Sequence, residues 1–266
     1  MATSATPNST PRMPPPTTPR AAQRVPQSLK VPIHALEARL AKPIAGITFP
    51  SSPLLSATLE YVSRHSVPVA LNHVIRCSYF ALIIARKLPK LDGATPVLIV
   101  LATLMHDLGW DPTGALISPD KRYEVDGANA ARDFLRLNDP DMAEADVQLI
   151  WDAIALHTTA SIAWYKEPEV AATSYGVMAD YFGPDLLGGK VITKDEWKEV
   201  IAAFPNTGFA DSVRGIMCAL CKSKPQTTYD NLLAGFGEDY VAGYKVKGNR
   251  LVDHLEAGLD KLKTMD

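Results

Sequence analysis

Five polar side chains interrupt apolar, helix-like stretches of this sequence, and all are of types that bind divalent metal ions. They are His73, His106, Asp107, His157 and Asp180. The pair at 106 and 107 follows directly on an apolar run that begins at residue 96. An unpaired carboxylate buried there is strongly unfavourable, and either a metal cation or a cationic partner such as Arg76 would relieve it. The residue types therefore indicate a metal site or a buried ion pair.

The segments that carry these side chains have the apolar spacing of helices. His73 falls on the same predicted helical face as Val69, Cys77 and Phe80. The run before His106 is apolar on every side, so that helix should be central and buried. We expect a helix from about residue 53, others over 68–88, 96–109, 126–137, 142–156, 168–183 and 193–204, and two or three more between 210 and 263.

Capping and turn signals also favour helices. We expect Asp126 to cap the helix over 126–137, and Thr193 forms a capping box with Glu196 for a later one. No stretch alternates apolar and polar residues as a half-buried strand does, and the sequence contains no internal repeat. The sequence therefore predicts an all-α fold, one compact multi-helix domain in which facing helices could build a metal site.

The first 30 residues differ in composition from the rest of the chain. They are rich in Pro, Ser and Thr, so we expect a disordered tail over 1–30 and an all-helical catalytic domain over 31–266. Arg12, Arg20 and Arg24 precede the first acidic residue, as in a mitochondrial transit peptide. Prolines at 14–16 would break the amphipathic helix of such a peptide. We therefore predict a cytoplasmic protein, with mitochondrial targeting as the alternative.

Charge and cysteine content argue against several classes of partner. The formal net charge is −2, so we expect no bulk attraction to nucleic acid or to an anionic membrane. No uninterrupted apolar run approaches the roughly 20 residues that span a bilayer. The cysteine count is odd, which favours a reducing compartment over a disulfide framework. Cys218 and Cys221 form a C-x-x-C without a second pair, and we interpret them as buried thiols on one helix face.

The order of the polar residues resembles that of the HD-domain superfamily of metal-dependent hydrolases. A single His73 precedes the pair His106-Asp107 and a distant Asp180. Together with the segments 66–78, 121–132 and 154–159, this order is similar to the fungal HD-type cyanamide hydratases. The resemblance implies that these four residues bind one zinc ion, that cyanamide, a small neutral nitrile, is hydrated to urea, and that the protein is a homodimer or higher homo-oligomer. A His₂Asp₂ site also suits iron or manganese.

Further residues in the matching motifs have implied roles beside the metal. His157 and Glu124 are candidates for the proton donor, because both side chains can act as general acids. Thr158 and Asn72 could orient the substrate by hydrogen bonds, and Arg76 could hold a ligand carboxylate. Two structural alternatives stay open at this point. Glu124 could instead stabilise a helix start, and Asn72 could bind nearby backbone.

Three other functions share the same predicted metal site. An HD-type phosphohydrolase acting on a nucleotide would need cationic groups around the phosphate, and only Arg76, Lys121 and Arg122 lie near the motifs. A hydratase of another small nitrile or isonitrile would use the same metal chemistry in a different pocket. A non-catalytic HD-type module is disfavoured, since all four ligand types are present.

Overall fold

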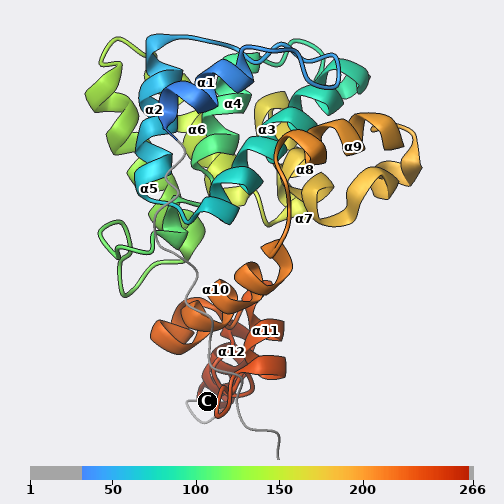
Figure 1. Ribbon diagram of the computed structural model, residues 1–266. Coiled ribbons are helices and arrows are strands. Elements are labelled where there is room, and N and C mark those ends of the chain that lie inside the picture. Colours follow the sequence, from blue (N-terminus) through green and yellow to red (C-terminus); the bar gives the residue numbers. More distant parts are fainter. Residues whose placement is uncertain (1–31, 264–266) are drawn as a thin grey trace, which may run out of the picture.

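The computed structural model describes residues 32–263, and its regular structure is helical (Figure 1). The α-helices are α1 (Ile33–Leu40), α2 (Pro53–Arg64), α3 (Pro68–Lys87), α4 (Pro96–Met105), α5 (Tyr123–Asn138), α6 (Glu144–Leu156), α7 (Ala160–Ala163), α8 (Pro168–Phe182), α9 (Lys194–Ala203), α10 (Phe209–Ser223), α11 (Leu233–Tyr240) and α12 (Leu251–Leu262). Short 3-10 helices are η1 (Pro89–Leu91), η2 (Leu108–Trp110), η3 (Gly183–Gly189) and η4 (Pro225–Thr227). Within residues 32–263, β pairing is limited to one isolated bridge between Ile44 and Ile47. The all-α prediction is confirmed, and the tail predicted over 1–30 lies outside the described residues.

Two apolar helices, α3 and α4, form the centre of the fold. Fourteen of the 20 residues of α3 are buried, and α4 buries every residue from Leu98 to Met105. Helices that are apolar on all sides must be covered on all sides, and α2, α5, α6 and α8 supply that cover. By length and composition α3 could cross a membrane, but 78% of its most apolar window is buried inside the protein.

Helix α8 packs against α3 at a glycine. A Cβ atom on Gly176 would lie 2.5 Å from the carbonyl oxygen of Cys77 and 2.6 Å from the Cβ atom of Ala81, so this approach requires glycine. Asp180 lies one helical turn after Gly176, and His73 lies one turn before Cys77. The two helices run in opposite directions, so this contact places Asp180 opposite His73.

Helix α4 is shorter than the sequence predicts. The prediction placed its end at Gly109, whereas the structure ends it at Met105 and leaves His106 and Asp107 in the break before η2. The chain turns there so that Gly109 can meet the start of α5. A Cβ atom on Gly109 would lie only 2.0 Å from the carbonyl oxygen of Tyr123.

The predicted start of α5 is also wrong. The helix begins at Tyr123, and Asp126 does not cap it. The Asp126 carboxylate instead accepts hydrogen bonds from Ser118 Oγ at 2.7 Å and from Lys224 Nζ at 2.6 Å. Lys224 lies 98 residues later in the chain, so local sequence could not indicate this use of the carboxylate. The capping box at Thr193 is confirmed, because both of its partners are local.

The C-terminal helices α10, α11 and α12 extend away from the main body of helices (Figure 1). Helix α10 packs on α11 around a small core that includes Met217, Leu220 and Leu233. Helix α12 has no buried residue. Its large apolar side chains are between 47% and 62% exposed: Leu251, Val252, Leu255, Leu259 and Leu262.

Candidate metal centre

Three histidines surround the carboxylate of Asp107 inside the protein. The Nε2 atom of His106 lies 3.1 Å from Asp107 Oδ2, that of His73 lies 3.4 Å from the same oxygen, and that of His157 lies 3.8 Å from Oδ1. His73 comes from α3, the His106-Asp107 pair from the break after α4, and His157 from the end of α6. None of the four residues is more than 4% exposed.

Two of these histidines have their tautomer set by the backbone. His106 Nδ1 lies 2.7 Å from the carbonyl oxygen of Thr103, and His157 Nδ1 lies 2.7 Å from that of Ile154. A carbonyl oxygen can only accept a hydrogen bond, so each Nδ1 must carry the proton. In the neutral imidazole the Nε2 lone pair then faces Asp107. This is the arrangement by which proteins orient metal-binding histidines.

The atoms that face each other in this cluster lack hydrogen bonds. His106 Nε2 and both carboxylate oxygens of Asp107 are buried without a hydrogen-bond partner, although they lie close to one another. Buried polar atoms are normally satisfied, so unsatisfied lone pairs that converge on one point require an explanation. A divalent cation provides one, because carboxylate oxygens and imidazole nitrogens are both metal ligands. The residues present therefore fit a metal ion.

Asp180 lies on the other edge of the His73 ring. Its Oδ2 atom is 2.7 Å from His73 Nδ1, and its two oxygens accept hydrogen bonds of 2.6 Å from Arg76 Nε and Nη2. Burial alone would raise the pKa of Asp180, but the bonds from Arg76 and His73 lower it, so the carboxylate is ionised. Arg76 thus binds the carboxylate of a predicted ligand, as the sequence predicts. Asp180 contacts the Nδ1 edge of the His73 ring, whereas Asp107 faces its Nε2 edge.

Asp107 and His157 are both deprotonated at neutral pH, for different reasons. Burial alone would raise the pKa of Asp107, but the neighbouring His106 and His73 hold it well below its usual value. Burial, together with the neighbouring His106, lowers the pKa of His157 to about 4. At neutral pH Asp107 is therefore a carboxylate, and His157 is a neutral imidazole that can accept a proton.

Glu124 and Thr158 are joined to each other beside this cluster. Thr158 Oγ1 donates a hydrogen bond of 2.7 Å to Glu124 Oε1, and Arg122 Nη2 donates one of 2.6 Å to the same oxygen. Burial alone would raise the pKa of Glu124, but the contacts with Arg122 lower it. An ionised carboxylate cannot donate a proton, so this geometry favours a positioning role for Glu124 over the proton donor that the motif suggested.

Asn72 is turned away from the centre. Its Nδ2 atom donates a hydrogen bond of 3.1 Å to the carbonyl oxygen of Pro205. Arg76 Nη1 donates to the same oxygen at 3.1 Å. The backbone-binding alternative for Asn72 is therefore the contact that the structure shows, and no contact with the metal cluster accompanies it.

Aromatic side chains that the sequence did not single out line the centre. The His73 ring stacks on Phe209 at 4.5 Å and on Trp110 at 6.0 Å between ring centroids, and Tyr181 meets it edge-on at 5.5 Å. Tyr123 Oη lies 3.4 Å from His157 Nε2. Trp110 and Tyr123 adjoin recognised motifs, which is a usable signal. Phe209 comes from the start of α10, and nothing in its local sequence indicates its position.

Comparison with known proteins identifies the central part of the chain. The family model of the HD domain matches residues 70–182, which include His73, His106, Asp107, His157 and Asp180. This segment is therefore similar to the HD domain. HD domains bind divalent metal ions and are in general metal-dependent enzymes of the hydrolase and phosphohydrolase type. A search of the curated proteins gives no match.

Proposed function

We propose that this HD-domain protein is a zinc-dependent hydratase that adds water to the nitrile of cyanamide and forms urea. One observation carries the choice among HD-type reactions. The cations that lie nearest the centre are already neutralised by carboxylates. Arg76 binds Asp180, and Arg122 binds Glu124. A phosphate ester needs cations free to stabilise its negative charge, whereas an uncharged nitrile does not.

The enclosure of the centre also favours a small substrate. His73, His106 and His157 are at most 1% exposed, and aromatic rings cover the His73 ring. A nucleotide would need a wide opening lined by polar groups. A molecule of cyanamide's size needs only a few atoms of free space beside Asp107.

A divalent metal ion at this centre would supply hydroxide near neutral pH, because it lowers the pKa of water from 15.7 towards about 7. The His157 side chain is positioned to accept the proton that the water loses. Its Nε2 lone pair faces the centre, and its lowered pKa keeps it neutral and ready to accept. The same nitrogen returns the proton to the nitrile nitrogen as the C–O bond forms at the nitrile carbon. The product of this addition is isourea, which tautomerises to urea.

Tyr123, Thr158 and Glu124 would position the reacting groups. Burial raises the pKa of Tyr123 well above its ordinary value, so its hydroxyl stays protonated and can donate towards His157 Nε2. Glu124, held by Arg122, fixes the hydroxyl of Thr158 beside the centre. These contacts would hold a planar, polar substrate in one orientation.

The test is urea formation from cyanamide by the purified full-length protein, before chelation, after chelation and after zinc is restored. We expect urea only when the metal is present. A panel of nucleoside monophosphates and other small nitriles runs in parallel. Phosphate release without urea would replace this proposal with a phosphohydrolase, and turnover of another nitrile without urea would change the substrate.

The variant His157→Ala tests whether His157 is a catalytic residue or a metal ligand. We expect metal content close to that of the unaltered protein, measured by elemental analysis, with turnover lowered by roughly 10²–10⁴-fold. If the variant contains no metal, His157 is a ligand and the proton carrier must be sought elsewhere.

A further inference from the structure

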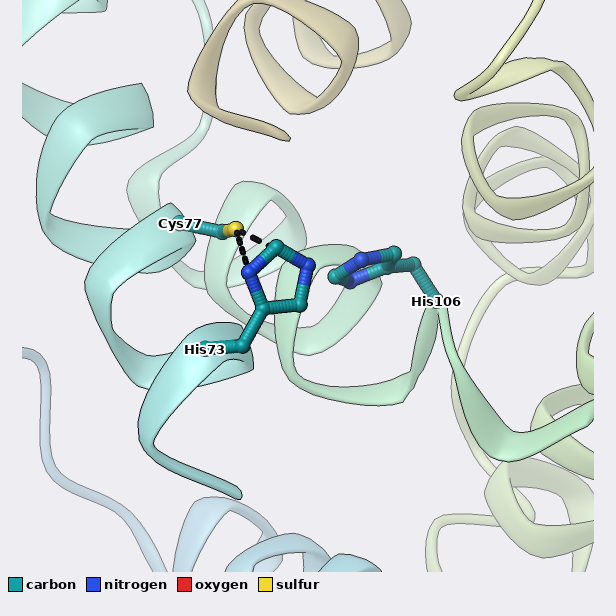
Figure 2. Close-up of side chains that lie close together, drawn as sticks. All are labelled: His73, Cys77 and His106. Carbon is teal, nitrogen blue, oxygen red and sulfur yellow. Dashed lines mark hydrogen bonds between the residues drawn. The ribbon is translucent and has the colours of Figure 1, made fainter. Parts of the chain in front are cut away.

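The proposed reaction leaves the buried thiol of Cys77 unused. Cys77 lies one helical turn after His73 on α3 and has no exposed surface. Its Sγ atom is 3.5 Å from His73 Nδ1 and 3.7 Å from His73 Nε2. Figure 2 shows the His73 ring between the Cys77 thiol and the ring of His106. Ligand atoms of these three residues all lie within 4.8 Å of one another.

We infer that Cys77 is a metal ligand of this protein and that its thiolate makes the centre select thiophilic cations, such as zinc and cadmium, over manganese and magnesium. The inference rests on the metal centre of the proposed function, but it does not depend on the substrate. It adds one sulfur and gives a second set of ligand atoms, those of His73, Cys77 and His106, which shares its histidines with the nitrogen and oxygen set around Asp107.

The distances within this second set suit a shared cation. Zinc binds sulfur at about 2.3 Å and nitrogen at about 2.0–2.1 Å, so two such ligands at a tetrahedral angle lie about 3.5 Å apart. The Cys77 sulfur is 3.7 Å from His73 Nε2, the ring nitrogen that also faces Asp107. Residues four apart on a helix are neighbours on one face, so α3 presents both side chains to the same point.

A second, independent feature indicates a ligand at this point. His106 Nε2 is buried without a hydrogen-bond partner. Its Nδ1 atom is held by the carbonyl oxygen of Thr103, which prevents the ring from turning its lone pair elsewhere. The histidine beside the thiol, His73, is bonded to Asp180, so the unsatisfied atom that indicates a cation is His106 Nε2.

The balance of charge favours a thiolate. Asp180 is already neutralised by two hydrogen bonds from Arg76. That leaves Asp107 as the one carboxylate within the cluster whose charge no cationic side chain cancels, and one anion does not neutralise a divalent cation. A thiolate at Cys77 would supply the second negative charge, because metal ligands bind in the deprotonated form and metal binding releases their protons. Soft thiolate ligands suit zinc, whereas manganese and magnesium prefer oxygen.

The experiment is a metal titration that detects sulfur directly. The host is the full-length chain with Cys218→Ser and Cys221→Ser, because the C-x-x-C on α10 could bind the probe by itself. After chelation, cadmium or cobalt is added while ultraviolet absorbance is followed. Thiolate ligands give a charge-transfer band that imidazole and carboxylate ligands do not. We expect this band to saturate at one equivalent.

The matched variant adds Cys77→Ser to the same host. We expect it to lose the band and to bind cadmium about 100-fold or more weakly, since even outer partners of metal ligands are worth roughly 10–100-fold. Its affinity for manganese should change far less. The result in the host stands on its own if this variant does not fold.

The inference is overturned if the host binds one equivalent of cadmium without the band, or binds no cadmium at all. Its failure is distinct from failure of the hydratase proposal. A band without urea formation leaves Cys77 as a ligand and removes the proposed reaction. Urea formation without the band removes Cys77 and leaves the reaction.

Discussion

Helices α4 and α12 are of similar length and both carry large apolar side chains, but the protein uses them in opposite ways. Helix α4 buries eight of its ten residues, whereas α12 buries none of its twelve. Helix α4 contacts α2, α3, α5, α6 and α8. Apolar spacing therefore predicts that a helix forms, while its burial depends on how many other elements reach it.

The same contrast holds for function. The segment that matches the HD-domain family carries every predicted metal ligand on or beside its buried helices. The C-terminal helices contribute chiefly through two side chains, Phe209 against the His73 ring and Lys224 against Asp126. The two regions should therefore respond differently to matched substitutions, and the largest difference should be in activity.

Asp107→Asn should remove bound metal and lower turnover by about 10³-fold or more, as loss of a principal catalytic group does. The amide keeps the shape of the side chain but cannot supply the anion that the cluster needs. Asp239→Asn on α11 is the control, since that side chain is exposed. Elemental analysis and urea formation measure both effects. Retained metal in the Asp107 variant would show that the cluster does not require this carboxylate.

Lys224→Met tests the contact that joins the two regions. Lys224 Nζ donates to Asp126 Oδ2 at 2.6 Å and to the carbonyl oxygen of Lys121 at 2.9 Å, and both charged groups are buried. Removing one member of a buried pair costs about 3–5 kcal/mol. Denaturant unfolding should show that loss relative to Lys222→Met, an exposed neighbour. Equal denaturation midpoints for the two variants would mean that the ion pair between Lys224 and Asp126 does not stabilise the contact between the two regions.

Leu101→Ala and Leu255→Ala compare the two helices directly. Leu101 on α4 has no exposed surface, and its truncation should lower the free energy of unfolding by about 2–5 kcal/mol. Leu255 on α12 is 57% exposed, and its truncation should change that free energy by no more than about 0.5 kcal/mol. A large effect at Leu255 would show that its apolar face is covered in solution.

Gly176→Ala and Gly258→Ala should have opposite signs. At Gly176 the new Cβ atom would clash with the backbone of α3, which should cost about 1–3 kcal/mol and displace Asp180. At Gly258 on α12 no atom lies within 4 Å, so alanine should stabilise the helix by up to about 1 kcal/mol. Thermal unfolding of the two variants checks both signs. A stabilised Gly176→Ala variant would mean that α8 can move away from α3 without a loss of unfolding free energy.

Local sequence was sufficient for much of the fold. Prolines at the first helical positions and the Thr193 capping box marked helix starts, because each signal acts within one turn. It failed where a distant residue decides the outcome. Asp126 has the chemistry of a helix cap, but Lys224 engages its carboxylate from 98 residues away. The end of α4 depends on the fit of Gly109 against α5, which no local pattern shows.

The same limit applies to the metal centre. The sequence selected the residues that meet around Asp107, because buried His and Asp residues need partners. It predicted that Arg76 holds a ligand carboxylate, but it could not specify which carboxylate or the contact of Asp180 with His73, because these depend on the register of α8 against α3. Cys77 was noted only as part of an apolar face. Its four-residue spacing from His73 was the available signal for a ligand.

The centre also sets an order of events during synthesis of the protein. Arg76 bonds to Asp180, 104 residues later, and to the carbonyl oxygen of Phe204, 128 residues later. At about 5–20 residues per second, the ribosome needs roughly 5–20 s to complete the first of these spans. Until then α3 carries an uncompensated guanidinium within an otherwise apolar helix. Pairing of the Arg76 charge is therefore a late step in the synthesis of this protein, after α8 has left the ribosome.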